Sequence, residues 1–535
     1  MKRYATRSST ILLLLLLCAA ACGGPRPVPR NVIVFVADGM GPQHLSLLYL
    51  YARYGTTAEK PLRDLAIKQM YDSGNMCLVM TEPYGNLVVD SACSATMFAG
   101  GGFARSEMIG LDKNGDPVET MLEKAKRLGK ATGLVTNTRI THATPAAFAA
   151  HVPHRDMEAR IAEQMLVLEV DVMLGGGLCY FLPEHVQSLA FKESNQELLA
   201  PLPEYIRRQS RRTDRRDLLA EARAKGYRLA HTRQQMLQAP EGKLLGLFAH
   251  SAMPDALTMH NQAHDPGRRM PSLSEMAQTA LNRLSQNDKG FFLMVEAGQI
   301  DYAGHDNDAG LLLHELLACE QAFACVWDWC KKHPDTLLLL LADHDTGSFA
   351  FSYSKAGIPP ARSLPGRAFR QREFQPAFNY GNPDVLDKLY RQQISFAAML
   401  SLFDNLPESE QTAPALAAIV NQYSRFTLSA SQAERVLAAE ANRFYREGHK
   451  YLCAPRVPRI DDFAEFYVYG DQVRRDLIGR ALAPQQMVCW GTGTHTATPV
   501  VAVAYGPGAC GLRGLLHMSD LGRWLMEAAG LAARE

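Results

Sequence analysis

The stretch NVIVFVADGMG, from Asn31 to Gly41, indicates the class of fold that this chain adopts. An unbroken apolar run precedes Asp38, without the alternation of a strand that faces water on one side. Such a run is typical of a strand that is buried on both faces in a parallel sheet. Ligands of open α/β sheets collect at the carboxyl ends of such strands, where Asp38 lies. We therefore expect an α/β fold with a large, mostly parallel central sheet and helices on both faces.

The same pattern recurs along the chain. Apolar runs predict further strands at Gly133–Val135, Asp171–Gly177, Leu244–Phe248, Phe291–Val295 and Leu337–Leu341. Between them, Thr120–Leu128 and a long segment from about Leu311 to Lys332 have the periodicity of helices. A chain of 535 residues is long enough for one large sheet that carries insertions.

The rhythm of strands stops between Ala350 and Gln485 and returns near Trp490. This segment is rich in Arg, Gln and Ala, and it has helical periodicity around Leu386–Leu402 and Ala430–Tyr445. The sequence therefore predicts a core in two parts, residues 31–350 and 486–535, interrupted by a mostly helical insertion at 351–485.

The N-terminus has the pattern of an export signal. Basic residues precede the apolar run Ile11–Leu17, and small residues lead to Cys22. The cysteine after Ala19–Ala21 resembles a bacterial lipobox, although the usual leucine is Ala19 here, so a plain signal-peptidase site is the alternative. We expect a signal peptide at 1–22, a tether at 23–30, and a protein exported to the periplasm or attached to the outer membrane.

The bulk properties limit the partners. A net charge of +1 and a pI near 7.6 argue against nucleic acid as a dedicated partner. We expect no internal stretch to be long and apolar enough to span a membrane, so membrane contact would come through a lipid on Cys22. Export permits disulfides, but their pairing cannot be deduced, and the odd number of cysteines after Cys22 leaves at least one thiol free.

A second stretch, LVVDSACSATMFAGG from Leu87 to Gly101, has two interpretations. A strand at Leu87–Val89 that leads into a helix would place Ser91 at the helix N-terminus, where unpaired N–H groups favour an anion. The small residues that follow let a substrate approach the backbone. Alternatively, Asp90 or Ser91 is an ordinary helix N-cap. This stretch by itself leaves both interpretations open.

Polar residues that suit metal ions follow several of the predicted strands. These are Asp38, Thr144, Glu296, Asp301, His305, Asp343, His344 and His495. Because parallel strands end at one edge of a sheet, we expect them to converge. Carboxylates with imidazoles are ligands for catalytic zinc, and oxygen ligands suit magnesium. Such a concentration of charge predicts a cluster of metal ions.

The chain resembles the alkaline phosphatase family. The resemblance covers Asn31 to about Ser348 and Trp490 to the C-terminus, in the ordered motifs VADGMG, VDSACSAT, THATPAA…HVPHR, VEAGQIDYAGHDND, LADHDTG and GTHTATPV…AYGPG. It implies that the chain hydrolyses small phosphate monoesters through a phosphoserine. In this family a segment such as 351–485 forms a crown over the site or a dimer contact, and the sequence does not choose between them, so a homodimer is left open.

The resemblance also implies the role of each site residue. Ser91 would be the nucleophile, and Arg155, oriented by Asp90, would bind two phosphate oxygens. Two Zn²⁺ and one Mg²⁺ would be held by three sets of ligands: Asp301, His305 and His495 for the first zinc; Asp343, His344, Asp38 and the ionised Ser91 for the second; and Asp38, Thr144 and Glu296 for the magnesium. The two zinc ions would stabilise the attacking and leaving oxygens of an in-line displacement.

Two residues depart from the best-known enterobacterial form of the family. His142 and Tyr302 stand where that form has an acidic residue and a lysine. An imidazole from His142 makes Zn²⁺ or Co²⁺ more favourable than Mg²⁺ at the third site. With tyrosine in place of lysine, we expect weaker retention of phosphate and faster product release.

Other functions give different patterns. A sulfatase needs Pro and Arg at two and four residues after its nucleophile, but Cys93 and Ala95 follow Ser91. A phosphodiesterase is harder to exclude, although Arg155 suits the two free oxygens of a monoester. A lipoprotein that only binds phosphate or metal would lack a ligand or the nucleophile, whereas every motif position is filled here.

Overall fold

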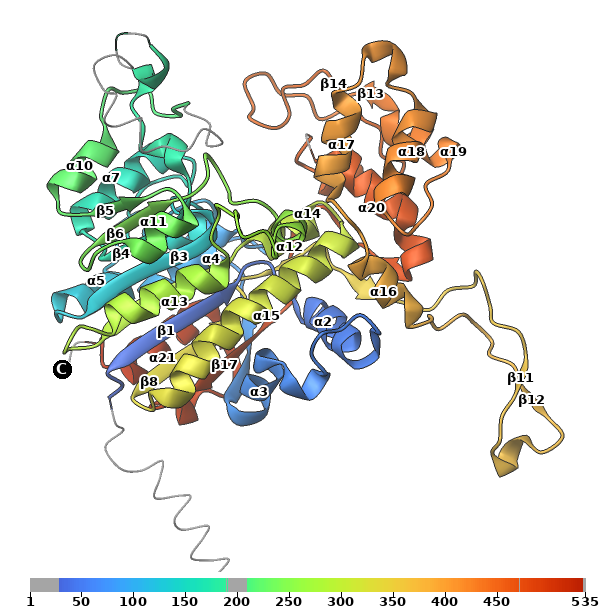
Figure 1. Ribbon diagram of the computed structural model, residues 1–535, viewed down its shortest axis with the longest axis horizontal. Helices are drawn as coiled ribbons and strands as arrows, with labels where there is room; N and C mark the ends of the chain where they lie inside the picture. The colour runs from blue at the N-terminus through green and yellow to red at the C-terminus, as the bar shows by residue number, and fades with distance from the viewer. Residues whose placement is uncertain (1–27, 189, 191–208, 471, 533–535) are drawn as a thin grey trace, which may run out of the picture.

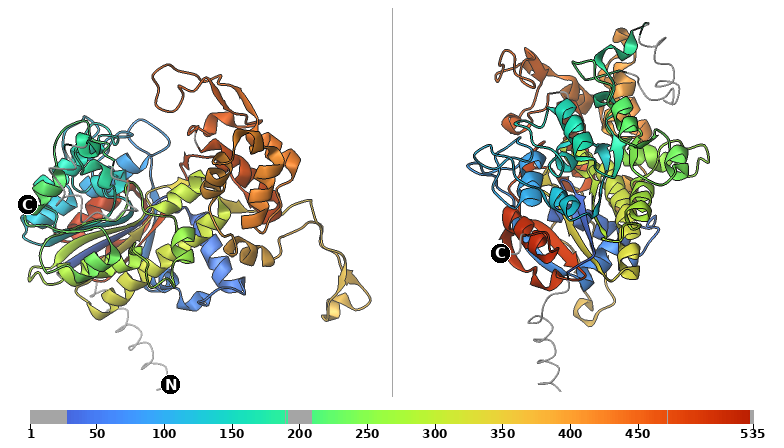
Figure 2. Two further views of the ribbon diagram at one scale, coloured as in Figure 1. Left: turned by 45° about the horizontal axis from the view of Figure 1, so that its top comes forward. Right: turned by 90° about the vertical axis from the view of Figure 1, so that its left-hand side faces the viewer.

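A computed structural model describes residues 28–188, 190, 209–470 and 472–532 (Figures 1 and 2). Its centre is a ten-stranded sheet in the order β18-β2-β17-β8-β1-β7-β3-β4-β6-β5. The strands are β1 (Asn31–Ala37), β2 (Asn75–Met80), β3 (Ala131–Arg139), β4 (Val172–Gly176), β5 (Arg228–Ala230), β6 (Leu244–Leu247), β7 (Phe291–Ala297), β8 (Thr336–Leu341), β17 (Val500–Tyr505) and β18 (Gly514–His517). Only β17 runs antiparallel to its neighbours in this sheet. The predicted mostly parallel α/β fold is confirmed.

The central strands are the apolar runs of the sequence. Strand β1 lies between β7 and β8, and every residue of these three strands is buried. Val36 is paired with Glu296 on one side and with Leu341 on the other. The carboxyl ends of the three strands therefore meet at one level, and the polar residues that follow them share one edge of the sheet.

Helices cover both faces of the sheet (Figure 1). On one face lie α3 (Ala66–Ser73), α13 (Leu273–Leu284) and α15 (Ala309–Lys332), and on the other lie α4 (Ser91–Gly100), α5 (Met121–Arg127) and α21 (Met518–Ala528). The expectation that no internal segment could span a membrane was wrong for α15, which is long and apolar enough by length and composition. However, 72% of its most apolar window is buried within the protein, as in the core helix of a globular domain.

The predicted strand at Leu87–Val89 was wrong. The strand before α4 is β2, and the chain between them runs through turns. Leu87 is 82% exposed, and Val88 is also exposed, so these residues pack against neither face of the sheet. Local apolar character suggested a strand here, but no neighbouring strand pairs with this segment in the described structure.

The segment 351–485 contains small hairpins and several helices. In order they are β11 (Arg362–Ser363) with β12 (Glu373–Phe374), α16 (Asp384–Tyr390), α17 (Phe396–Asp404), α18 (Ala413–Tyr423), α19 (Ala430–Leu437), β13 (Ala439–Ala441) with β14 (Arg456–Pro458), and α20 (Val473–Gln486). The β11–β12 hairpin lies at the tip of an extended arm (Figure 1). Helices α17 to α20 lie beyond α14 (Gln299–His305), at the end of the sheet toward which β1 points.

The two helical periods expected in this segment differ from the helices that form, because one is divided and the other ends early. The period at Leu386–Leu402 is divided between α16 and α17, because Ser395 caps a new helix by accepting from the Ala398 N–H. The period at Ala430–Tyr445 stops at Leu437, where strand β13 begins to pair with β14. In both places, the helix boundary depends on an interaction that the periodic pattern does not contain: a side-chain cap in the first and a strand pairing in the second.

The insertion and the sheet domain share one buried apolar cluster. Asp308, at the N-cap of α15, accepts hydrogen bonds from the Gln392 side chain at 2.8 Å and from the Phe396 N–H at 2.8 Å. Because Asp308 comes directly after α14, these bonds tie the insertion to the helix that carries Asp301 and His305. The insertion is therefore held against the candidate site.

Cysteine pairing is absent from the described part of the chain. Cys77, Cys93, Cys179, Cys319, Cys325, Cys330, Cys453, Cys489 and Cys510 all have free thiols. Cys18 and Cys22, with the predicted signal peptide and most of the tether, lie outside the described residues.

Glu315 on α15 makes stability depend on pH. Its side chain is buried, and its Oε1 accepts from the Ala256 N–H at 2.7 Å. Burial raises the pKa of Glu315 to about 8 from 4.5, so the folded chain keeps a proton that the unfolded chain releases. The free energy of unfolding therefore falls as pH rises between these values, with a slope of up to about 1.4 kcal/mol per pH unit. Glu315→Gln keeps the acceptor and removes this titration, so its melting temperature should rise relative to wild type from pH 5 to pH 8.

The control for this experiment is Glu59→Gln, which changes an exposed glutamate. The difference in melting temperature between this control and wild type should stay constant over the same pH range. Parallel pH profiles for Glu315→Gln and wild type would contradict the expected linkage.

Candidate active site and metal centre

The predicted site residues meet at the carboxyl edge of the sheet. Asp38 follows β1, Asp343 and His344 follow β8, and Glu296 lies at the end of β7. The other ligands come from short elements beside this edge: Thr144 from α6 (Ala143–Ala146), Asp301 and His305 from α14, and His495 from β16 (His495–Thr496), which pairs with β9 (Asp345–Thr346). Most of these side chains are at least nine-tenths buried, so the arrangement is part of the interior.

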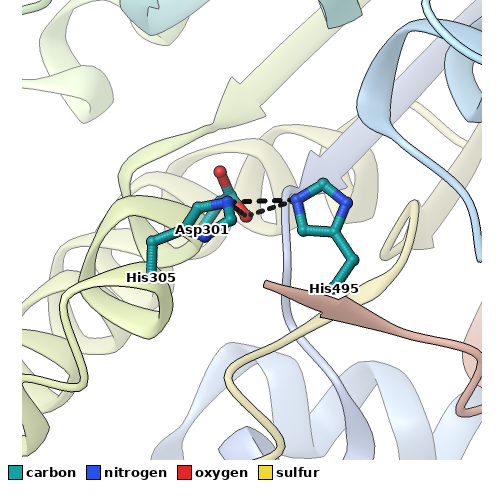
Figure 3. Close-up of side chains that lie close together, drawn as sticks. All are labelled: Asp301, His305 and His495. Carbon is teal, nitrogen blue, oxygen red and sulfur yellow. Dashed lines mark hydrogen bonds and ion pairs between the residues drawn. The ribbon is translucent and has the colours of Figure 1, made fainter. Parts of the chain in front are cut away.

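Asp301, His305 and His495 form the first ligand group (Figure 3). Asp301 Oδ1 lies 3.3 Å from His305 Nε2 and 3.4 Å from His495 Nε2, and the two Nε2 atoms are 3.1 Å apart. Each imidazole is oriented through its other nitrogen, because His305 Nδ1 bonds the Gly493 carbonyl at 2.7 Å and His495 Nδ1 bonds the Val89 carbonyl at 2.9 Å. Backbone bonds of this kind hold metal-binding imidazoles in position.

The second group lies around His344 and includes the candidate nucleophile. Asp38, Asp301 and His344 place their ligand atoms within 4.8 Å of one another. His344 Nε2 is 3.4 Å from Asp38 Oδ1, 3.3 Å from Asp343 Oδ2 and 3.1 Å from Ser91 Oγ. The Ser91 hydroxyl therefore lies as close to His344 Nε2 as the carboxylate oxygens of Asp38 and Asp343 do.

The third group consists of Asp38, His142 and Glu296. The Thr144 hydroxyl donates to Asp38 Oδ2 at 3.5 Å. Glu296 Oε2 accepts from the Thr138 hydroxyl at 3.2 Å, which leaves Oε1 for another partner. His142 is a direct member of this group, so the departure noted in the sequence lies at the third site.

Several buried atoms in these groups have no hydrogen-bond partner among the described residues. They are Asp38 Oδ1, Asp343 Oδ2, Glu296 Oε1 and His142 Nδ1. Burial and neighbouring carboxylates raise the pKa of Asp38, and burial raises the pKa of Asp343 and of Glu296. Cations at this position would remove the repulsion and bind the three carboxylate oxygens, whereas His142 Nδ1 carries a proton as long as its Nε2 accepts from Arg155. The mixed nitrogen and oxygen ligands of the first two groups fit zinc, and the oxygens of Asp38, Thr144 and Glu296 fit magnesium.

Asp301 differs electrostatically from the other carboxylates. Burial by itself would raise its pKa, but His305 and His495 lower the pKa of Asp301 well below its usual value. Asp301 is therefore an anion between two imidazoles, and it belongs to both the first and the second group.

Asp90 caps the helix, as the sequence suggested, and also pairs with Arg155, as the family resemblance implies. It caps α4 by accepting from the Ala92 and Cys93 N–H groups, each at 3.3 Å. Its Oδ2 also accepts from Arg155 Nη1 at 2.9 Å. Burial opposes ionisation, but Arg155 and these bonds lower the pKa of Asp90 to about 2. Ser91 is thus the first residue of α4, where backbone N–H groups favour an anion.

Arg155 lies between Asp90 and His142. Its Nη2 is 3.2 Å from His142 Nε2, and because a guanidinium can only donate, His142 accepts and is neutral. Burial, together with the positive charges of Arg139 and Arg155, lowers the pKa of His142. The Arg155 backbone N–H donates to the Glu107 carbonyl at 2.8 Å, which fixes the main chain from which the guanidinium extends.

The sequence did not single out two residues beside the site. Arg139, at the end of β3, pairs with Glu158 at 2.8 Å, and the nearby Tyr302 side chain contributes to the raised pKa of its guanidinium. Arg139 could have been recognised as a site residue from the sequence, because it lies at the end of a predicted strand next to the THATP motif. Tyr469 belongs to the insertion, and its ring packs on His305 with centroids 5.1 Å apart. No pattern in the sequence indicated this contact.

The fold and the site define an α/β protein with a serine at a buried candidate metal site. The family model described as "Alkaline phosphatase" matches residues 29–434, and the chain belongs to this family. The matched region extends beyond Ser348 through most of the insertion, which is further than the motifs indicated.

Individual relatives agree with this assignment. The chain is 35% identical over 326 residues to alkaline phosphatase 4 of Bacillus subtilis, covering 60% of this chain and 62% of the relative. It is 31% identical over 363 residues to streptomycin-6-phosphate phosphatase of Streptomyces griseus, covering 60% of this chain and 74% of that protein. The crystal structure of Thermus thermophilus alkaline phosphatase matches with a TM-score of 0.73 and 28% identity, over 96% of this chain and 94% of that one. The chain thus spans less than two thirds of the Bacillus relative.

Proposed function

We propose that this protein is an exported alkaline phosphatase that hydrolyses small phosphate monoesters through a phosphoserine at Ser91. The observation that carries the proposal is the position of Ser91 Oγ, 3.1 Å from His344 Nε2 among buried carboxylates and imidazoles. The names of the relatives, which are alkaline phosphatases and a phosphatase of streptomycin 6-phosphate, support a monoester substrate.

The first two ligand groups would hold zinc, and the third would hold magnesium. His142 in the third group favours zinc or cobalt there, because imidazole suits those metals better. When bound, the two zinc ions would act as Lewis acids toward the attacking and leaving oxygens.

The protein's own residues bind the phosphate and supply the nucleophile. Arg155 binds two non-bridging phosphate oxygens through its planar fork, and Asp90 holds that fork in place. Ser91 Oγ loses its proton to solvent and bonds to phosphorus as the bond from phosphorus to the alcohol oxygen breaks, and the alcohol leaves with a proton taken from water. Water then attacks the phosphoserine, which releases inorganic phosphate and returns Ser91 to its initial form. The N-terminal end of the α4 dipole favours the negative charge that develops at Ser91.

The test is hydrolysis of a chromogenic phosphomonoester at alkaline pH, with and without a chelator. Hydrolysis that the chelator abolishes and added zinc restores would support the proposal. A phosphodiester and a sulfate ester in the same assay separate the other enzyme functions, since a preference for either would replace the proposed substrate class. Absence of hydrolysis for every ester, with phosphate binding retained, would favour the non-catalytic alternative.

Tyr302→Lys tests the expected weak retention of phosphate. Tyr302 packs its ring edge-on to His142, with centroids 6.0 Å apart, so a lysine here adds positive charge beside Arg155. We expect inorganic phosphate to inhibit this variant several-fold more strongly, and kcat to fall as product release slows. Tyr302→Phe, which adds no charge, is the control. An unchanged inhibition constant for phosphate in Tyr302→Lys would contradict the prediction.

Export and assembly are parts of the same proposal. The N-terminal pattern supports cleavage before Cys22 and lipid attachment there, in the periplasm or at the outer membrane. Incorporation of labelled fatty acid that is lost in Cys22→Ala would support the anchor, and a soluble, unlabelled product would contradict it.

The exposed arm between β10 (Ala350–Phe351) and α16 offers a contact for a second copy, and the mass of the purified protein in solution tests for a homodimer.

A further inference from the structure

Two tyrosines of the insertion lie against the site. The Tyr469 ring stands edge-on to the His305 imidazole, with centroids 5.1 Å apart and an angle of 88°. The Tyr451 ring stands edge-on to Tyr469, also at 5.1 Å. Tyr451 is 37% exposed, whereas Tyr469 is partly buried, so the pair extends from the first ligand group to the surface.

Tyr469 is near both sides of the expected phosphate position. Its charge interactions include Asp301 in the first ligand group, and Arg155 and Asp90 on the other side. The Tyr469 hydroxyl has no hydrogen-bond partner among the described residues. Tyr469 is therefore within electrostatic range of both Arg155 and the first ligand group, between which an ester would bind.

Backbone contacts hold this part of the insertion at the site. The Phe466 carbonyl accepts from the Thr492 hydroxyl at 3.0 Å and from the Gly493 N–H at 3.3 Å. The Gly493 carbonyl in turn bonds His305 Nδ1. Residues just before Tyr469 are thus linked to a metal-ligand imidazole through one residue, which limits how far the ring can move away.

A second contact reaches the opposite side. Lys450 Nζ donates to Asp156 Oδ2 at 2.6 Å, and Asp156 directly follows Arg155. The same Lys450 lies 4.9 Å from the Tyr451 ring centroid. The insertion therefore contacts the core on both sides of the site, and the two rings lie between these contacts.

We propose that Tyr469 and Tyr451 form a leaving-group subsite that favours phosphomonoesters of flat, aromatic alcohols over those of aliphatic alcohols. The inference rests on the proposed function of Ser91. The phosphate is held by Arg155 and the ligand groups, which are common to all monoesters. The alcohol part of the ester extends from there toward the surface, along the two rings. Aromatic groups gain from edge-to-face and offset contacts with such rings, whereas a small polyol gains little.

The test compares phenyl phosphate with glycerol 2-phosphate as substrates of the metal-loaded, full-length protein. For Tyr469→Leu we expect the ratio of the two kcat/KM values to fall about tenfold, mainly through KM for phenyl phosphate. Tyr451→Leu should lower the ratio less, about threefold, because its ring is further out. Tyr469→Phe keeps the ring and should keep the ratio. The inhibition constant of inorganic phosphate and the metal content should stay unchanged in all three variants.

The matched control is Tyr445→Leu, which changes a half-exposed tyrosine of the same loop as Tyr451. It should leave the ratio at the wild-type value. An unchanged ratio in Tyr469→Leu, or an equal loss for both esters, would overturn the subsite while the phosphatase function stands. If the wild-type protein hydrolyses neither ester, the proposed function itself fails.

Discussion

Ser91→Ala is expected to reduce hydrolysis of a phosphomonoester by about 10³-fold or more, at unchanged metal content. Removal of the attacking group of an enzyme typically costs this much, because the remaining groups still bind and polarise the substrate but no covalent intermediate forms. Arg155 stays paired with Asp90 in this variant, so inorganic phosphate should bind with nearly wild-type affinity. Steady-state kinetics, phosphate inhibition and trapping of labelled phosphoserine at acidic pH measure these three effects.

Ser94→Ala is the matched control for this substitution, since Ser94 is a second buried serine on α4. Its hydroxyl donates to the Asp343 carbonyl at 2.8 Å, and loss of such a bond costs about 1 kcal/mol. We therefore expect at most about a tenfold loss of activity. Activity in Ser91→Ala equal to that of Ser94→Ala would exclude Ser91 as the nucleophile.

Asp301→Asn is expected to remove metal from the protein and to lower activity by about 10³-fold. Asp301 Oδ1 lies within 3.4 Å of both His305 Nε2 and His495 Nε2, and it also accepts from Thr346 at 2.6 Å. Because this carboxylate belongs to two ligand groups, a neutral amide weakens both at once. Metal content per chain and kcat/KM at saturating zinc measure the loss.

The melting temperature gives a second measurement for Asp301→Asn. A ligand that binds only the folded state stabilises it, so a chelator should lower the melting temperature of the wild type and have little effect on the variant. Asp328→Asn, a change of an exposed carboxylate on α15, should behave like wild type. Full zinc content in Asp301→Asn would contradict its assignment as a shared ligand.

The sheet was predictable because its strands are determined by short-range patterns. The runs at β1, β7 and β8 are apolar at almost every position, and a strand covered on both faces buries all of them. Where the pattern was equally apolar but brief, as at Leu87–Val89, no neighbouring strand was available and the prediction was wrong. Membership of a sheet depends on pairing, which a local pattern does not contain.

Asp90 shows how a single residue can serve two predicted functions. The local sequence suggested a helix cap, and the family resemblance implied a partner for Arg155. The structure contains both, because the cap uses Oδ1 and Oδ2 at the edge of the carboxylate while Arg155 Nη1 approaches Oδ2. The Asp90–Arg155 pair depends on tertiary structure, because the two residues are 65 positions apart in the sequence.

The sequence by itself determined the fold class, the order of the motifs and the residue types that meet at the edge of the sheet. Tertiary structure alone decided how these residues combine: His305 and His495 are 190 positions apart, yet their Nε2 atoms lie 3.1 Å from each other. It also placed Arg139 beside Tyr302, and Tyr469 of the insertion against His305. The physical reason is that strand periodicity is a local property, whereas the pairing of ligands and rings depends on long-range packing of the insertion and the sheet.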